Sequence, residues 1–156
     1  MRRAAALLGV AALIASGCGG SSHDDQATPA PPKPPPATAS GESVIRGWTM
    51  AMYRGDYDTA ARYFAVDAII QQVETIVLRT HEDAVAWGRS LPCRAKVTGI
   101  RHEKNGVLLA TFDLFPGVGG TCPDGGSARV RFFIRHGKIE TWRQLPDPPK
   151  PKGQSV

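Results

Sequence analysis

Asp113 is the residue whose surroundings best suit proton-transfer chemistry. It lies in the run Thr111-Phe112-Asp113-Leu114-Phe115, and flanking aromatic rings can raise the pKa of a carboxyl group by withdrawing it from water. A carboxylate with a raised pKa can act as a general base. The alternative is that Asp113 faces solvent or pairs with Arg101 or Arg131, since one acid does not define a site. Asp113 is therefore a candidate catalytic residue rather than an assigned one.

No other motif for catalysis, metal binding or nucleic-acid binding stands out. The sequence has no Gly-rich phosphate loop, no His-x-x-x-His pair and no Gly-x-Ser-x-Gly elbow. His23, Asp24 and Asp25 adjoin one another, but a solvated linker does not preorganise metal ligands. The lysines and arginines are scattered and do not alternate with exposed aromatic residues, which argues against nucleic acid as a partner. We expect no metal and no cofactor.

The first seventeen residues have the organisation of an export signal. Met1-Arg2-Arg3 is a short positive segment, Ala4 to Ala15 is apolar, and Ala15-Ser16-Gly17 supplies small residues for a signal peptidase. The apolar run is too short to span a membrane, which takes roughly 20 residues. Removal of residues 1–17 would leave 17 lysines and arginines against 14 acids, a net charge of +3.

The order Ala15-Ser16-Gly17-Cys18 resembles the bacterial lipobox, in which the cysteine thiol is diacylated and the cysteine becomes the new amino terminus. The resemblance implies a lipoprotein attached by Cys18 to the cell membrane or the outer membrane and facing the extracytoplasmic side. Two acyl chains give stable anchoring, whereas one holds a protein only marginally. The alternative is an incidental cysteine in an ordinary secretory signal.

Proline-rich segments flank the part of the chain that can form a core. Residues 18–40 include Pro31-Pro32-Lys33-Pro34-Pro35-Pro36 and offer almost nothing apolar to bury, so we expect a disordered or polyproline II tether. A proline-rich ligand for a recognition domain is the alternative. Residues 147–156 repeat the pattern and read as a tail. One domain is thus expected over residues 41–146.

Cys93 and Cys122 form an even pair once Cys18 carries lipid. In an exported protein such a pair predicts a disulfide. The alternatives are a catalytic thiol, which would need a neighbouring base, and a zinc site, which would need four close ligands. Neither pattern accompanies these cysteines.

Helical periodicity predicts three helices in the first half of the domain. From Glu42 to Arg54 one face carries Val44, Ile45, Trp48 and Met52, and Gly55 follows as a left-handed cap. Asp56 caps a second helix with Ala60, Ala61 and Phe64 on one side. Thr80, with His81-Glu82-Asp83 after it, begins a third helix in the manner of a capping box.

Period-two patterns predict strands in the remainder. Two short strands cover residues 68–74 and 75–79, and four more cover residues 95–101, 107–115, 128–135 and 138–145. His136-Gly137 joins the last two as a tight turn, so Ile134 should oppose Ile139 and Phe132 should oppose Thr141. Arg131 is expected to stack on Trp142. Helices followed by a meander indicate an α+β domain.

The runs Trp48 to Ala65 and Phe132 to Trp142 resemble the start and the closing hairpin of the nuclear transport factor 2-like, or SnoaL-like, superfamily. This resemblance implies a cone-shaped, curved mixed or antiparallel sheet wrapped by three N-terminal helices, with a pocket between them and often a homodimer through the sheet. Five residues could line such a pocket, which would be mostly apolar with one polar group: Trp48, Met52, Phe64, Gln72 and Phe132. The alternative is that the same residues fill the core.

Ketosteroid-isomerase-like members of the superfamily use a tyrosine and two aspartates. Counting along the resemblance, those positions fall on Trp48, Gln72 and Val130. An indole, an amide and an aliphatic side chain do not supply that chemistry. The leading hypothesis is therefore a non-catalytic module that binds a small apolar ligand or a protein partner. The alternatives are an enzyme that uses Asp113, in the manner of an epoxide hydrolase or a cyclase, and a structural module without an open pocket.

Overall fold

The computed structural model describes residues 36, 38–117, 122 and 126–146. The expected signal peptide (1–17), Cys18, most of the tether and the tail (147–156) lie outside the described residues. The predicted domain, residues 41–146, falls within them except for residues 118–121 and 123–125. Among the described residues, no helix is both long and apolar enough to cross a membrane.

Helix α1 (Gly41–Arg54) follows directly from its caps and its apolar face. The Ser40 side chain accepts a hydrogen bond from the backbone N–H of Ser43 at 3.2 Å, which satisfies one of the free donors of the first turn. Gly55 ends the helix with φ 74°, a left-handed conformation that costs glycine little. Val44 and Ile45 on the apolar face are fully buried.

Helix α2 (Tyr57–Ala61) is shorter than the sequence indicates, and strand β1 (Phe64–Gln71) begins earlier. Asp56 caps α2 as predicted, since its carboxylate accepts from the N–H of Thr59 at 3.0 Å. The expectation that Phe64 belongs to this helix is wrong. The backbone of Phe64 pairs in parallel with Ile139, and the Tyr63 carbonyl accepts from the Ile139 N–H at 2.8 Å. This distant pairing draws residues 64–67 into the sheet.

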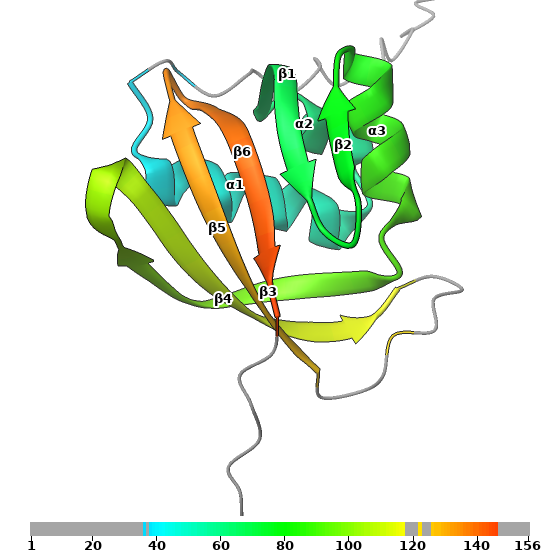
Figure 1. Cartoon of the computed structure of the whole chain (residues 1–156). Helices are drawn as coiled ribbons and strands as arrows, with labels where there is room; N and C mark the ends of the chain where they lie inside the picture. The colour runs from blue at the N-terminus through cyan, green and yellow to red at the C-terminus, as the bar shows by residue number, and fades with distance from the viewer. Residues whose placement is uncertain (1–35, 37, 118–121, 123–125, 147–156) are drawn as a thin grey trace, which may run out of the picture. The chain divides into compact units, whose positions relative to one another are not determined.

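The remaining elements are helix α3 (His81–Ser90), strands β2 (Thr75–Leu78), β3 (Cys93–His102), β4 (Val107–Pro116), β5 (Ser127–Arg135) and β6 (Lys138–Leu145), and a 3-10 turn over Lys104–Gly106. The strand order is β2-β1-β6-β5-β4-β3, and only the β1–β6 pair is parallel. Helix α1 lies across one face of the curved sheet, behind β5 and β6 in Figure 1. The predicted α+β class and curved mixed sheet are confirmed.

The β5–β6 hairpin corrects two predicted contacts. His136 and Gly137 both have positive φ, and Ile134 opposes Ile139 as predicted. A register shift between Phe133 and Ile134 then places Phe132 opposite Trp142, so its predicted pairing with Thr141 is wrong. Trp142 is consequently buried on the inner face of the sheet.

The predicted stacking of Arg131 on Trp142 is wrong for the same reason. Arg131 lies opposite Arg143, and its Nε donates to the Glu103 carboxylate at 2.7 Å. Its guanidinium is therefore held on the face of the sheet that points away from the helices.

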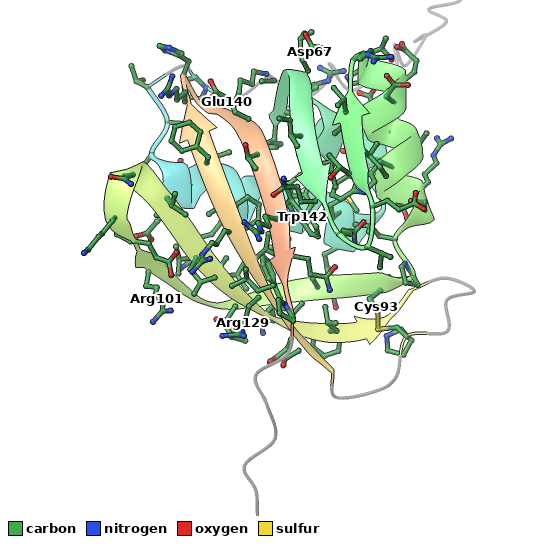
Figure 2. The ribbon with its side chains drawn as sticks, viewed as in Figure 1. Asp67, Cys93, Arg101, Arg129, Glu140 and Trp142 are labelled. Carbon is green, nitrogen blue, oxygen red and sulfur yellow. A yellow bond between two sulfur atoms is a disulfide. The ribbon has the colours of Figure 1, made fainter. Side chains whose placement is uncertain are left out.

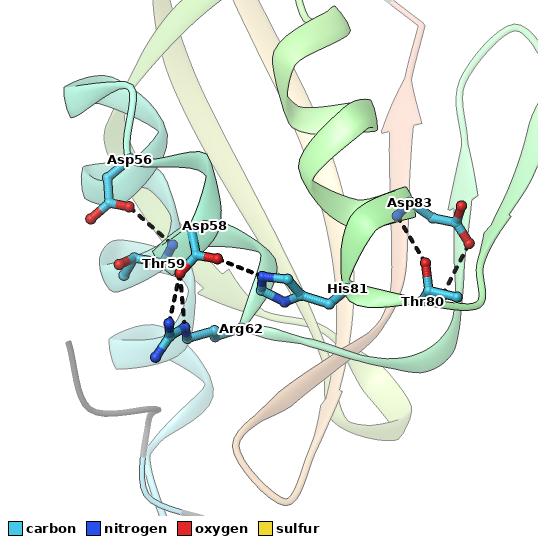
Figure 3. A network of polar contacts seen from close by, with 7 residues as sticks. All are labelled: Asp56, Asp58, Thr59, Arg62, Thr80, His81 and Asp83. Carbon is cyan, nitrogen blue, oxygen red and sulfur yellow. Dashed lines mark hydrogen bonds and ion pairs between the residues drawn. The ribbon is translucent and has the colours of Figure 1, made fainter. Parts of the chain in front are cut away.

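A network of polar side chains joins α2 to the start of α3 (Figure 3). Asp58 accepts hydrogen bonds from Arg62 at 2.7 Å and contacts Nε2 of His81 at 2.8 Å. Thr80 and Asp83 cap α3 reciprocally, which confirms the predicted capping box. The hydrogen bond from His81, with that from Arg62, lowers the pKa of the Asp58 carboxyl.

Replacement Asp58→Asn should lower thermal stability near neutral pH, because it removes the charge that His81 and Arg62 contact. A lowered folded-state pKa means that the unfolded chain binds more protons near pH 4, so this stabilisation is present above that pH and is lost as the pH falls below it. Melting temperatures of both proteins should therefore converge below about pH 4. Asp67→Asn, at an exposed position of β1, is the matched control; an Asp58→Asn difference that persists unchanged at low pH would contradict the assignment.

Candidate functional site

A cavity of about 150 Å³ lies between α1 and the inner face of the sheet. The rings of Trp48, Phe112 and Trp142 form much of its wall, and Leu114 and Val130 continue the apolar surface. The other lining residues come from the β1–β2 turn, the segment that follows α3, and strands β3, β5 and β6: Gln72, Leu91, Pro92, Cys93, Ala95, Ala128 and Gln144.

Three of the lining residues, Gln72, Pro92 and Gln144, are exposed and mark the open side of the cavity. Gln72 and Gln144 are both exposed while the aromatic walls are buried. Gln72 donates through Nε2 to Oε1 of Gln144 at 3.1 Å, and its own Oε1 accepts from the Trp87 indole at 3.4 Å. The amide pair therefore bridges β6 and the β1–β2 turn at the mouth and is held in place by α3.

Cys93 and Cys122 are joined by a disulfide, as the sequence predicts (Figure 2). The bond connects the first residue of β3 to the segment between β4 and β5, and Cys93 itself lines the cavity. Gly117 also donates its N–H to the Pro92 carbonyl at 3.3 Å. These two links fix the chain between α3 and β3 beside the mouth.

Trp48 and Trp142 each bury an indole N–H that has no hydrogen-bond partner among the described residues. Both rings line the cavity, and their side chains are only 4% and 5% exposed. A buried donor without a partner costs about 1–3 kcal/mol. Neither indole nitrogen is accessible to solvent in this structure, so a ligand oxygen would accept from it only after the ring shifts toward the cavity.

The three positions that resemble the isomerase catalytic set are brought together. Trp48, Gln72 and Val130 all line this one cavity. None of the described lining residues has a free acidic or basic side chain, since Cys93 is in a disulfide. These residues can bind and orient a molecule but cannot exchange a proton with it near neutral pH.

Of the five predicted pocket residues, the structure places two at the cavity. Trp48 and Gln72 line it, whereas Met52, Phe64 and Phe132 do not. Met52 packs toward Gly88 of α3. Phe64 and Phe132 are buried in the core against the rings of Trp87 and Trp48. The side chains of these three residues pack between the layers and do not line this cavity.

Sequence reasoning missed Phe112, Trp142 and Gln144 as wall residues. Phe112 was assigned only the role of a neighbour to Asp113, and Trp142 was expected to stack on an arginine. The period-two pattern around Asp113 could have predicted Phe112 as a wall residue, because Phe112 and Leu114 share the face of the strand opposite to Asp113.

Asp113 itself faces away from the cavity. It is exposed on β4, between two residues whose side chains line the cavity wall, and it lies opposite Lys96 and Ser127. The suggested pairing with Arg101 or Arg131 is also wrong, since both guanidinium groups contact Glu103. This position does not support a role for Asp113 as the base of a reaction in the cavity. The described residues include no cluster of three or more histidine, cysteine or acidic side chains that could hold a metal.

No protein-family model and no curated protein sequence matches this chain. Solved structures do resemble it. An NTF2-like protein of unknown function from Cytophaga hutchinsonii has a TM-score of 0.56 and 11% sequence identity, over 70% of this chain and 91% of that one. A protein provisionally named a ketosteroid isomerase, from Kribbella flavida, has a TM-score of 0.55 and 13% identity, over 73% and 87%.

A third similar structure is a provisionally named polyketide cyclase from Sinorhizobium meliloti, with a TM-score of 0.53 and 15% identity over 66% of this chain and 94% of that one. The domain is thus an α+β domain with the nuclear transport factor 2-like fold. At these identities the similarity defines the fold alone.

Loss of the disulfide should destabilise the domain and loosen the mouth of the cavity. The cysteines are 29 residues apart, and in the chain-entropy model closing such a loop contributes roughly 3–4 kcal/mol. The double variant Cys93→Ser/Cys122→Ser should therefore lower the melting temperature by at least about 10 °C. Cys18→Ser is the control and should leave the melting temperature unchanged. A double variant as stable as the parent would show that the bond contributes nothing to folding.

Proposed function

We propose that the domain is a non-catalytic binding module that takes a small, uncharged, mostly apolar molecule with an acceptor oxygen into the cavity behind Gln72 and Gln144. The observation that carries this proposal is the wall itself, a mostly apolar surface that includes the rings of Trp48 and Trp142, whose indole N–H groups have no partner among the described residues. Binding sites of this kind combine apolar walls with a few polar groups that fix orientation.

The size of the cavity limits the ligand. Its volume is about 150 Å³, and an engineered apolar cavity of about that volume in another protein holds benzene. A molecule with a single ring would fit inside, and a longer one would extend past the two glutamines. Phe112 and Trp142 provide most of the contact with the ring.

The charge of the wall limits the ligand further. No described lining residue is charged, so a carboxylate or an ammonium group would lose its hydration without gaining a partner. A neutral carbonyl, ether or hydroxyl oxygen loses less hydration, and it can accept from the indole N–H of Trp48 or Trp142 once that ring turns toward the cavity. The expected ligands are therefore cyclic or short-chain neutral molecules.

The membrane attachment is part of the same proposal. The lipobox-like residues up to Cys18 support export and lipid modification, which would hold the domain at an extracytoplasmic membrane surface through the tether of residues 18–40. A module fixed there would meet molecules that enter or leave the membrane. The surroundings of Asp113 give no support to an enzymatic alternative.

The three tryptophans of the chain provide a direct test of the ligand class. Because the chain has three tryptophans, the protein should show three indole N–H signals in a ¹H–¹⁵N spectrum. All three rings lie at or beside the cavity. Titration with cyclohexanone should shift the signals of Trp48 and Trp142 in a saturable way, because the carbonyl oxygen accepts from an indole. Cyclohexanecarboxylate should cause no saturable shift, since its charge finds no partner.

Ala128→Leu should weaken cyclohexanone binding at least tenfold, because it adds three carbon atoms to the wall of the cavity. Ala86→Leu, the same change at an exposed position of α3, should leave the affinity unchanged. Equal effects of the two substitutions, or equal binding of the carboxylate, would refute the proposed site.

Cys18 should carry the lipid in the native protein. Intact-mass analysis of the detergent-extracted chain should give a polypeptide that begins at residue 18 with the added mass of a diacylglyceryl group. The Cys18→Ala variant should lack both this mass and the cleavage. A mature chain of unmodified mass would instead indicate an ordinary secretory signal.

A further inference from the structure

The outer face of the sheet, which points away from the helices, carries a row of arginines. Strand residues alternate between faces, so Arg143 follows the inward Trp142, and Arg131 precedes the inward Phe132. The register places Arg143 opposite Arg131, which in turn lies opposite Leu109 of β4. Arg101 of β3 lies opposite Leu109 and completes the row.

The row crosses four neighbouring strands, so it extends roughly 14 Å at about 4.8 Å per strand. Arg129 adds a further guanidinium two residues before Arg131 on the same strand. Figure 2 shows Arg101 and Arg129 projecting from the sheet on the side away from α1. The face therefore presents four arginines spread over an area rather than converging on one point.

Two acids lie on or beside this face: Glu103, which follows β3, and Asp113 of β4, which lies opposite Lys96. Glu103 contacts Arg131 at 2.7 Å and Arg101 at 3.5 Å, so one carboxylate serves two guanidinium groups. Arg129 donates to the Pro146 carbonyl, and its buried Nε has no partner among the described residues. The guanidinium group of Arg143 has no ion pair or side-chain hydrogen bond among the described residues.

The charge imbalance extends to the second half of the domain, which contains strands β3 to β6. Residues 93–146 contain nine lysines and arginines against four acids, whereas residues 41–92 contain five against seven. Like charges directly opposite each other on neighbouring strands destabilise a sheet. A surface that keeps Arg131 beside Arg143 is suited to a partner that supplies negative charge. A second copy of the same face would add positive charge instead, which argues against a homodimer through this surface.

We propose that the outer face of the sheet docks on an anionic phospholipid bilayer. A bilayer offers many mobile phosphates in a plane, which matches arginines dispersed along a row. Exposed Ile69 and Val77 lie opposite each other on the same face, beside the row, and basic side chains flanked by apolar ones are typical of interfacial binding. Docking would turn the opposite, helix-covered face of the sheet toward solvent.

The experiment uses the chain from residue 18 with the substitution Cys18→Ala, so that vesicle binding does not depend on the lipid. A failure to bind vesicles then says nothing against the lipid anchor or the cavity, which are tested separately. Co-sedimentation with vesicles of phosphatidylcholine containing 30% phosphatidylglycerol should greatly exceed that with phosphatidylcholine alone. Binding should fall as salt is raised, because screening weakens surface electrostatics.

The double variant Arg101→Gln/Arg143→Gln should lower the vesicle partition coefficient about 25-fold, from about fivefold per basic residue at an anionic surface. The matched control, Arg54→Gln/Arg79→Gln, removes the same charge from exposed positions outside the row and should change it less than twofold. Unchanged indole N–H signals would verify that both variants fold.

Three results would overturn the proposal. Equal binding to neutral and anionic vesicles would exclude a role for charge. An equal loss of vesicle binding in both double variants would show that binding depends on the net charge of the protein and not on the arginine row. A dimer, detected by analytical ultracentrifugation, that is weakened by Arg101→Gln/Arg143→Gln would assign the face to a second copy of the chain.

Discussion

The indole of Trp48 packs against aromatic rings from four different elements. Its ring centroid lies 6.1 Å from Phe64 of β1, 6.3 Å from Trp87 of α3, 6.5 Å from Phe112 of β4 and 5.8 Å from Phe132 of β5. Pairs at such separations stabilise by about 0.5–1.5 kcal/mol beyond the area they bury. This one side chain of α1 therefore sets the distance between the helices and the sheet, and the cavity is the space that the cluster leaves on one side of it.

Local signals predicted the helices well, and long-range pairing caused the errors. Gly55 and the pair Thr80 and Asp83 mark helix ends through contacts within a few residues, which the sequence displays directly. Phe64 joins a strand because its backbone pairs with Ile139, 75 residues later. No local pattern carries that information, since parallel pairing depends on how the whole sheet is assembled. The same reason explains the missed register shift in the last hairpin.

The residues of the candidate site also differ in how far the sequence alone could indicate their positions. Trp48 and Gln72 line the cavity, and the resemblance reaches them by counting from fixed turns to positions on one wall. Met52 and Phe132 lie elsewhere, and the sequence does not show this, since an apolar residue that fills a core and one that lines a cavity look alike in sequence. The basic residues of the sheet also looked scattered along the chain. Only the register of β5 and β6 brings Arg131 and Arg143 side by side.

Successive side chains of β6 point to opposite faces of the sheet, so this one strand contributes to both proposed surfaces. Trp142 contributes to the cavity and Arg143 to the outer face, although they are adjacent in sequence. Because the sheet lies between them, a charge change at Arg143 alters the potential outside while the apolar wall stays intact. A change at Trp142 alters the wall without altering the charge. Ligand capture and membrane docking would thus be carried by one sheet through independent sets of side chains, so that either property could change in evolution without the loss of the other.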